Sequence, residues 1–113
     1  MMVDDEQSLR EVLCSTLRAQ GAEVTDAPNG TSAFQILQGK KIDLVISDIR
    51  MPGGDGVQLL TNIKQMKGFQ PKVILITGHA DIGADEALKK GAVALLPKPF
   101  GGEKLINVIL EHI

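Results

Sequence analysis

The chain alternates between short runs of consecutive apolar residues and longer segments with an apolar residue every three or four positions. Residues 44–46 and 73–76 are uninterrupted apolar runs, which are typical of strands covered on both faces of a parallel sheet. Segments of the second kind give a helix one apolar face. These segments are Leu9, Val12, Leu13, Thr16 and Leu17; Ala33, Ile36 and Leu37; Leu59, Leu60 and Ile63; and Leu105, Ile106, Ile109 and Leu110.

Glycine residues mark where the predicted helices end. Gly21, Gly39, Gly68 and Gly91 each follow a helical segment, where the left-handed backbone that ends many helices favours glycine. The pattern therefore predicts a strand followed by a helix, five times. The strands are expected at 1–4, 23–27, 42–48, 72–77 and 93–97, and the helices at 7–19, 31–38, 56–66, 82–90 and 102–112.

Five such units joined by right-handed crossovers form a doubly wound α/β sheet. The chain of 113 residues has the length of one domain, so we expect residues 1–113 to fold as a single unit. Sheets of this class bind ligands beyond the carboxyl ends of their strands, where the strand order reverses. Candidate chemistry is therefore sought at the strand ends.

Composition narrows the classes of function. A net charge of −2 gives no overall attraction to nucleic acid or to anionic lipid, so we expect this chain to contact neither directly. No apolar run approaches the roughly 18 residues of a membrane span. Cys14 is the single cysteine, which excludes an internal disulfide and is compatible with the cytoplasm. It lies off the apolar face of its segment, so we expect a partly exposed, unreactive thiol.

Polar residues follow four of the five predicted strands. Asp4 and Asp5 end the first strand, Asp48 ends the third, Thr77 ends the fourth, and Lys98 follows the fifth. Because the carboxyl ends of parallel strands meet at one edge of the sheet, these five side chains are expected to lie close together.

These residue types suit phosphoryl transfer to a carboxylate. Three neighbouring carboxylates repel one another, and a hard cation such as Mg²⁺, which binds one or two carboxylates together with phosphate oxygens, relieves the repulsion. A carboxylate such as Asp48 can form an aspartyl phosphate. The ammonium group of Lys98 and the hydroxyl group of Thr77 can stabilise the charge on the transferred group.

Four segments also resemble a known family. They are residues 3–6 (VDDE), 47–56 (SDIRMPGGDG), 76–81 (ITGHAD) and 97–100 (PKPF). Together they are similar to the successive signatures of receiver domains of response regulators, the phosphoacceptor domains of two-component signal transduction. The resemblance covers essentially the whole chain. It implies a flavodoxin-like (βα)5 fold with a five-stranded parallel sheet in the order 2-1-3-4-5.

The resemblance also implies a role for each site residue. Asp48 is then the phosphoacceptor, and Asp5, Asp48 and the backbone carbonyl of Arg50 bind Mg²⁺ directly. Asp4 acts through a metal-bound water, Thr77 is the switch hydroxyl, and Lys98 is the partner of the phosphoryl group and precedes a cis proline.

The implied partners are a sensor histidine kinase or phosphotransfer protein, which supplies the phosphoryl group, and an output domain or target protein that binds the last two helices. A phosphorylation-linked homodimer and slow self-catalysed dephosphorylation also follow from the resemblance, as does a signalling role without enzymatic turnover.

Two positions depart from the family pattern. The family usually has an aromatic residue three positions before the lysine of the fifth strand, and here that position is Leu95. That aromatic side chain moves with the switch threonine in the family, so we expect altered or weakened coupling from Thr77 to the last two helices. Gly54 replaces a larger residue, and with Gly53 it predicts a mobile loop after Asp48.

Three other classes of protein stay open. A haloacid-dehalogenase-like phosphohydrolase also combines Asp, Thr, Lys and Mg²⁺, but Arg50 stands where the second Asp of its D-x-D-x-T motif would lie. A degenerate receiver would bind partners without phosphorylation. A nucleotide-binding flavodoxin-like protein is less favoured because no glycine-rich phosphate loop follows a strand. Of the remaining residues, Asp55 is expected to cap the helix that follows it, and Phe34, Phe69 and Phe100 are expected to be packing residues.

Overall fold

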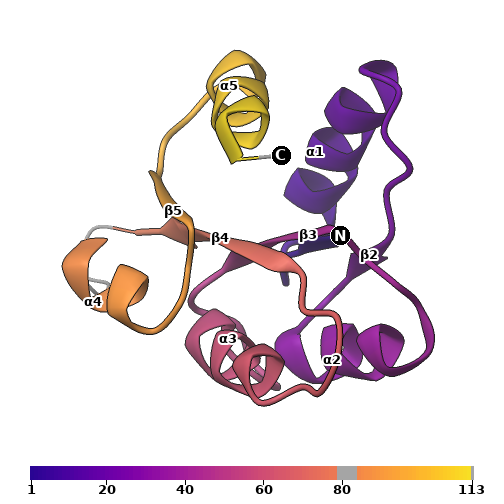
Figure 1. Ribbon diagram of the computed structural model, residues 1–113. Helices are drawn as coiled ribbons and strands as arrows, with labels where there is room; N and C mark the ends of the chain where they lie inside the picture. The colour runs from indigo at the N-terminus through magenta and orange to yellow at the C-terminus, as the bar shows by residue number, and fades with distance from the viewer. Residues whose placement is uncertain (79–83, 113) are drawn as a thin grey trace.

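The computed structural model describes residues 1–78 and 84–112, and its strands and helices alternate along the chain (Figure 1). The strands are β1 (Met2–Val3), β2 (Asp26–Ala27), β3 (Leu44–Asp48), β4 (Lys72–Thr77) and β5 (Ala94–Pro97). The helices are α1 (Gln7–Ala19), α2 (Gly30–Gly39), α3 (Gly56–Lys64), α4 (Ala84–Lys89) and α5 (Gly102–His112). The expected alternation is confirmed, although β1 and β2 are shorter than predicted and residues 82 and 83 of the fourth predicted helix lie outside the described residues.

The five strands form one parallel sheet in the order β2-β1-β3-β4-β5. The order reverses between β1 and β3, which are neighbours in the middle of the sheet. Helices α1 and α5 lie on one face and α2 and α3 on the other, with α4 beside β5 (Figure 1). The chain therefore has the flavodoxin-like, doubly wound fold that the sequence predicts.

Two apolar clusters fill the two sides of the sheet. Val45 belongs to the cluster under α2 and α3, whereas its neighbour Ile46 belongs to the cluster under α1 and α5. Val73 and Ile74 divide between the clusters in the same way. Successive strand residues point to opposite faces, so a strand covered on both sides needs an uninterrupted apolar run.

The apolar face of α1 is rotated from the predicted one. Val12 is 61% exposed, while Cys14 is only 2% exposed and packs with Leu13 and Leu17. Val12 is two residues from Cys14 and five from Leu17, spacings that do not share a helix face, so it lies away from both. The expectation of a partly exposed thiol was wrong: burial, aided by the charge of Asp26, raises the pKa of the Cys14 thiol.

Three further expectations were wrong. Leu110 is 62% exposed, because α5 turns Leu105 inward and leaves the solvent side to Leu110. Phe69 is 50% exposed, and the ammonium nitrogen of Lys41 lies over it, 4.6 Å from the centroid of the Phe69 ring. Phe34 and Phe100, in contrast, pack against the core clusters as predicted. Gly39 is the last residue of α2 and has no positive φ, unlike Gly21, Gly68 and Gly91.

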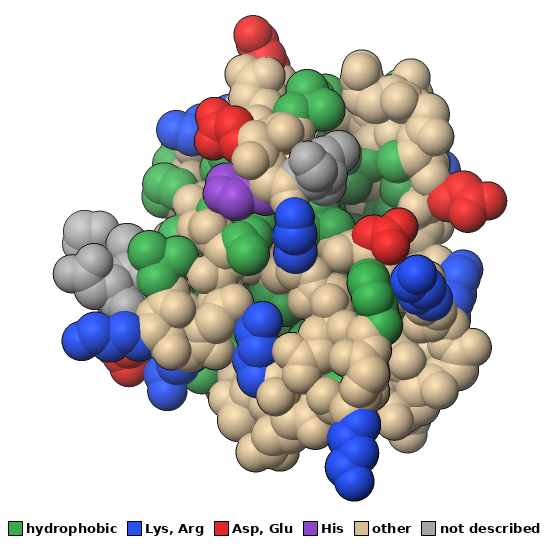
Figure 2. Space-filling model, in the orientation of Figure 1, with side chains coloured by type: hydrophobic (Ala, Val, Ile, Leu, Met, Phe, Trp, Pro, Cys, Tyr) green, Lys and Arg blue, Asp and Glu red, His purple; other side chains and the backbone are tan. Residues whose placement is uncertain are grey.

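Two observations on the described residues bear on binding to a membrane or to a nucleic acid. No described helix is both long and apolar enough to cross a bilayer. Among the described residues on the face seen in Figure 2, Lys and Arg side chains are spread between polar and acidic ones rather than gathered in one continuous patch. Electrostatic binding of a phosphate backbone uses such a patch.

Candidate functional site

Strand register brings the predicted site residues to one edge of the sheet. Val3 of β1 pairs with Ser47 of β3, so the residues that follow each of them, Asp4 and Asp48, leave the sheet side by side. Asp48 in turn pairs with Ile76 of β4, the residue before Thr77. Thr77 pairs with Pro97 of β5, the residue before Lys98. The edge therefore presents Asp4, Asp48, Thr77 and Lys98 in the spatial order of their strands.

Three carboxylates converge at the point where the strand order reverses. Asp4, Asp5 and Asp48 each offer one oxygen atom, and these three atoms lie within 4.8 Å of one another. Asp4 and Asp48 are buried, whereas Asp5 is exposed at the mouth of the cluster. Among the described residues, this is the group of acidic side chains that could hold a cation. An all-oxygen set that is open to solvent on one side suits Mg²⁺, which keeps several of its waters.

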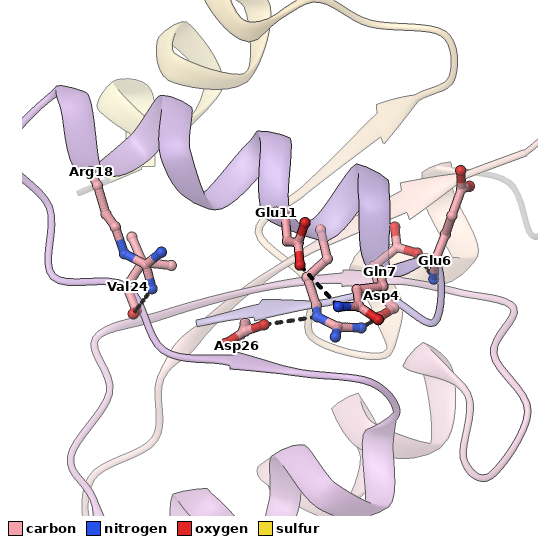
Figure 3. Close-up of polar contacts among 8 residues, drawn as sticks. Asp4, Glu6, Gln7, Glu11, Arg18, Val24 and Asp26 are labelled. Atoms are coloured by element: carbon pink, nitrogen blue, oxygen red, sulfur yellow. Dashed lines mark hydrogen bonds and ion pairs between the residues drawn. The ribbon is translucent and has the colours of Figure 1, made fainter.

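Three of the four polar atoms of Asp4 form hydrogen bonds. Its backbone N–H donates to the carbonyl of Ala27 at 3.2 Å, and its carbonyl accepts from Nη1 of Arg10 at 2.7 Å. Its Oδ1 atom accepts from the backbone N–H of Glu6 at 2.9 Å (Figure 3). Oδ2 is buried and has no hydrogen-bond partner among the described residues. A buried, unpartnered carboxylate oxygen is unfavourable unless a cation or water binds it, so Asp4 fits a cation site.

Like charge adds to the cost of ionising Asp4. Burial raises the pKa of the Asp4 carboxyl, and the nearby charges of Asp48 and Asp5 raise it further, although the N–H of Glu6 and the charge of Lys98 oppose them. A divalent cation would reverse the balance, because an opposite charge within a few ångströms favours the ionised form.

Lys98 forms an ion pair with the predicted phosphoacceptor. Its Nζ atom lies 2.7 Å from Oδ2 of Asp48, within hydrogen-bonding distance. Burial works to lower the pKa of Lys98, but the hydrogen bond to Asp48 and the charges of Asp48, Asp4 and Asp5 outweigh it, and the pKa is raised. The Lys98 side chain therefore stays cationic at neutral pH beside the carboxylate.

The backbone around Lys98 fixes where its side chain begins. The N–H of Lys98 donates to the carbonyl of Thr77 at 2.9 Å, and the peptide bond between Lys98 and Pro99 is cis, as the resemblance implies. Thr77 is buried at the end of β4.

The two remaining residues of the predicted site lie outside the acid cluster. Leu95 pairs with Leu75 and is half-buried against the cluster under α2 and α3. Arg50 is an exposed residue of the loop that follows β3.

The loop after Asp48 is bound to the start of α2. The carbonyl of Gly54 accepts from the N–H of Gly30 at 2.9 Å, and the carbonyl of Gly53 accepts from the hydroxyl of Thr31 at 2.6 Å. Gly53 and Gly54 have φ angles of 81° and 127°, which glycine adopts readily. The predicted mobility of this loop stays a prediction, but its glycines also serve a close contact with α2. Asp55 caps α3 as predicted, since its Oδ1 accepts from the N–H of Gln58 at 2.7 Å.

Sequence reasoning missed two groups that shape the site. One is Arg10, which is bound to Asp4 and to Asp26; the signal was a basic residue one turn and a half beyond the acidic pair. The other is Gly56, where any Cβ atom would overlap the backbone carbonyl of Asp48. A glycine directly after a helix-capping Asp55 was its sequence signal.

The fold and the site together define a class: doubly wound α/β proteins with an acidic cluster and a lysine at the carboxyl edge of the sheet. Comparison with known proteins identifies the family within that class. The family described as "Response regulator receiver domain" matches residues 1–110. The chain therefore belongs to the receiver domain family of bacterial two-component response regulators. Receiver domains generally bind Mg²⁺ and serve as signalling domains.

Individual relatives agree with this assignment. The chain is 40% identical to the DNA-binding transcriptional regulator NtrC of Escherichia coli over 113 residues, which is 99% of this chain and 24% of that protein. It is 37% identical to the transcriptional regulatory protein FixJ of Bradyrhizobium diazoefficiens over 99% of this chain and 55% of that protein. The chain thus spans about a quarter to about half the length of these relatives.

The solved structures agree as well. The crystal structure of the receiver domain of NtrX from Brucella abortus matches with a TM-score of 0.87 and 33% identity, over 97% of this chain and 93% of that chain. A match over nearly the full length of an isolated receiver domain confirms the fold and the family assignment.

Proposed function

We propose that Asp48 accepts a phosphoryl group from a phosphohistidine of a sensor histidine kinase or of a phosphotransfer protein. The observation that carries the proposal is the position of Asp48, buried between the ammonium group of Lys98 and the carboxylates of Asp4 and Asp5. One carboxylate oxygen forms a new bond to phosphorus while the P–N bond of the phosphohistidine breaks. The electron pair of that bond stays on the imidazole nitrogen of the donor.

The chain's own groups account for the charges in this step. Asp4, Asp5 and Asp48, with the backbone carbonyl of Arg50, would hold Mg²⁺, which when bound offsets the negative charge of the phosphoryl oxygens. Lys98 supplies a second positive charge next to Asp48. Thr77, the last residue of β4, is assigned to donate its hydroxyl hydrogen to a phosphoryl oxygen. Phosphoryl transfer depends mainly on such positioning and charge stabilisation.

The product acts as a signal rather than as a released compound. We assign residues 1–113 as one phosphoacceptor unit, which transfers the phosphoryl group to itself and loses it slowly to water. We also assign the surface of α4, β5 and α5 as the contact for an output domain, a target protein or a second phosphorylated copy. The chain would act in the cytoplasm, as is typical of the family, and would not itself contact nucleic acid.

Leu95 sets how far the signal travels within the domain. Leucine is smaller than the aromatic residue usual at this position and has no hydroxyl, so it follows a movement of Thr77 less closely. We expect phosphorylation to shift the NMR signals around Asp48 and Thr77 more than those along α4 and α5. Equal shift changes at Leu95, α4 and α5 would contradict this expectation.

The test of the proposed function is intact-protein mass spectrometry after incubation with Mg²⁺ and acetyl phosphate. We expect one phosphoryl adduct per chain, absent in Asp48→Asn and absent when EDTA removes the metal. A folded protein that forms no adduct would instead be a binding module that works without phosphorylation. Rapid, repeated hydrolysis of small phosphate esters would indicate a phosphohydrolase.

A further inference from the structure

Arg10 on α1 connects the residue that follows β1 with the first residue of β2. Its Nη1 atom donates to the backbone carbonyl of Asp4, after β1, at 2.7 Å. Its Nε atom donates to Oδ2 of Asp26, the first residue of β2, at 2.8 Å. The two acceptors, Asp4 and Asp26, lie side by side beneath α1 in Figure 3. The Arg10 side chain is only 14% exposed, whereas that of Asp26 is 41% exposed.

The bond from Arg10 completes the set that orients Asp4. Hydrogen bonds to Ala27, Arg10 and Glu6 engage the backbone N–H, the backbone carbonyl and Oδ1, so only Oδ2 is left without a partner. With the other three polar atoms engaged, the direction of Oδ2 is determined. A cation site gains from such fixed ligands, because partners that orient a metal ligand contribute strongly to its affinity.

The charge of the pair points to positioning rather than to electrostatic attraction. Asp26 offsets the positive charge of Arg10 at 2.8 Å, so the pair brings almost no net charge to the neighbouring carboxylates. An unpaired arginine in the same place would weaken cation binding by repulsion. The planar guanidinium can donate in two directions at once, which a lysine ammonium cannot match in this fork geometry.

We propose that Arg10, held in place by Asp26, is a positioning residue for the Mg²⁺ site and orients the free carboxylate oxygen of Asp4. The proposal rests on the proposed function in that it assigns the metal to this cluster. Asp26, on the edge strand β2, would then support the site although it is not one of the three clustered carboxylates.

Arg18 offers a matched control on the same helix. Its Nη2 atom donates to the backbone carbonyl of Val24 at 2.9 Å, so it also ties α1 to the segment that leads into β2 (Figure 3). This bond lies away from the acid cluster, since Arg18 is two turns further along α1 than Arg10. Removing either arginine removes a hydrogen bond that anchors α1, but of the two only Arg10 is hydrogen-bonded to Asp4.

The experiment is an NMR titration of the ¹⁵N-labelled chain with MgCl₂ in four forms: wild type, Arg10→Met, Arg18→Met and Asp26→Asn. We expect Arg10→Met to weaken Mg²⁺ binding by about tenfold, as for other groups that orient a metal ligand. Arg18→Met is expected to bind as the wild type does. Asp26→Asn keeps an acceptor for Nε of Arg10 but leaves the arginine charge uncompensated, so it is expected to weaken Mg²⁺ binding, though less than Arg10→Met does. Unchanged affinity in Arg10→Met, or equal losses in both arginine variants, would overturn the proposal.

A second measurement in the same samples separates this proposal from the metal assignment. Without Mg²⁺, the amide proton of Glu6 reports its hydrogen bond to Oδ1 of Asp4. Its chemical shift is expected to change in Arg10→Met and not in Arg18→Met. A wild type that binds no Mg²⁺ but shows this pattern would refute the metal site and leave the positioning of Asp4 by Arg10 intact. An unchanged Glu6 shift in Arg10→Met would refute the positioning itself. Arg10→Lys serves if the methionine variant does not fold, and an intermediate affinity is expected.

Discussion

The ammonium nitrogen of Lys98 lies 2.7 Å from Oδ2 of Asp48, so residues 50 positions apart in the chain form one ion pair across the end of β4. The Asp48 side chain is nearly buried, whereas that of Lys98 is partly open to solvent. The pair therefore joins a fixed carboxylate to a cation that can move toward a new negative group. Phosphorylation of Asp48 would create such a group beside it.

Replacing Lys98 with Met is expected to slow phosphorylation more than it affects stability. Loss of one positively charged partner of a developing negative charge typically costs roughly a hundredfold in rate. The cost in folding free energy is expected to stay below about 1 kcal/mol, because partly exposed ion pairs contribute little. The rate of adduct formation from acetyl phosphate measures the first effect, and urea unfolding measures the second. Lys104→Met, on an exposed residue of α5, is the control, and an equal rate in both variants would contradict the assigned role of Lys98.

Replacing Asp4 with Asn is expected to stabilise the metal-free fold at neutral pH. The folded state raises the pKa of Asp4, so within the titration range it binds more protons than the unfolded state. Stability therefore falls as pH rises from below the ordinary value of 3.8 through the folded-state pKa, and the ionised carboxylate is unfavourable at pH 7. An uncharged Asn side chain does not ionise, so the variant does not lose this stability as the pH rises. Urea unfolding in EDTA at pH 3.5 and at pH 7 should show a gain at pH 7 that shrinks at pH 3.5.

The same variant is expected to lose Mg²⁺ binding, which separates stability from function at one residue. Asp43→Asn, at an exposed position before β3, is the control for removal of a negative charge. A destabilised Asp4→Asn protein at pH 7 without metal would show that the carboxylate contributes more through its bond to Glu6 than it costs through burial.

Replacing Gly56 with Ala is expected to destabilise the fold by about 2 kcal/mol or more, because forcing a group into occupied space shifts the backbone. The added Cβ would overlap the carbonyl of Asp48, so the end of β3 would move with it. Gly39→Ala is the matched control: it adds the same atom at the end of α2, where nothing lies within 4 Å, and the φ angle is not positive. That variant should gain up to about 1 kcal/mol, since alanine restricts the unfolded chain. Thermal unfolding of both variants measures the difference, and equal midpoints would contradict the overlap.

The thiol of Cys14 is expected to react slowly with Ellman's reagent in the folded protein. It is buried under α1 and its pKa is raised, so both access and the thiolate fraction are low. Ser15→Cys in a Cys14→Ser background places a thiol on the neighbouring exposed position and should react rapidly. Fast reaction of native Cys14, without unfolding, would show that α1 opens readily from the sheet.

The strand ends were predictable from sequence because their chemistry depends on topology alone. Once residues 44–48 and 72–77 are assigned to parallel strands, Asp48 and Thr77 must reach the same edge, and Asp4, Asp5 and Lys98 follow by the same argument. The contact between Lys98 and Asp48 confirms that part of the prediction. The roles of Asp48, Thr77 and Leu95 stay predictions that the experiments above address.

Side-chain contacts between elements were beyond the sequence pattern. The spacing of Leu9, Val12 and Leu13 fits several helix rotations, and the packing of Cys14 against the sheet decides among them. The bond between Arg10 and Asp26 depends on how α1 crosses β2, which no local pattern encodes. The exposure of Phe69 has the same origin, because a single aromatic residue in a loop does not show which surface it will contact.

The attachment of the loop after β3 to α2 also determines where the chain accepts changes of length. Connections between strands and helices usually tolerate insertions. This loop is closed at its base by the bond from the N–H of Gly56 to the carbonyl of Ile49 and is fastened at its tip through Gly53 and Gly54. One inserted residue would break one attachment or the other. The turns at Gly21 and Gly68, where an added Cβ atom would meet nothing within 4 Å, are the places for an inserted epitope tag or a permuted chain end.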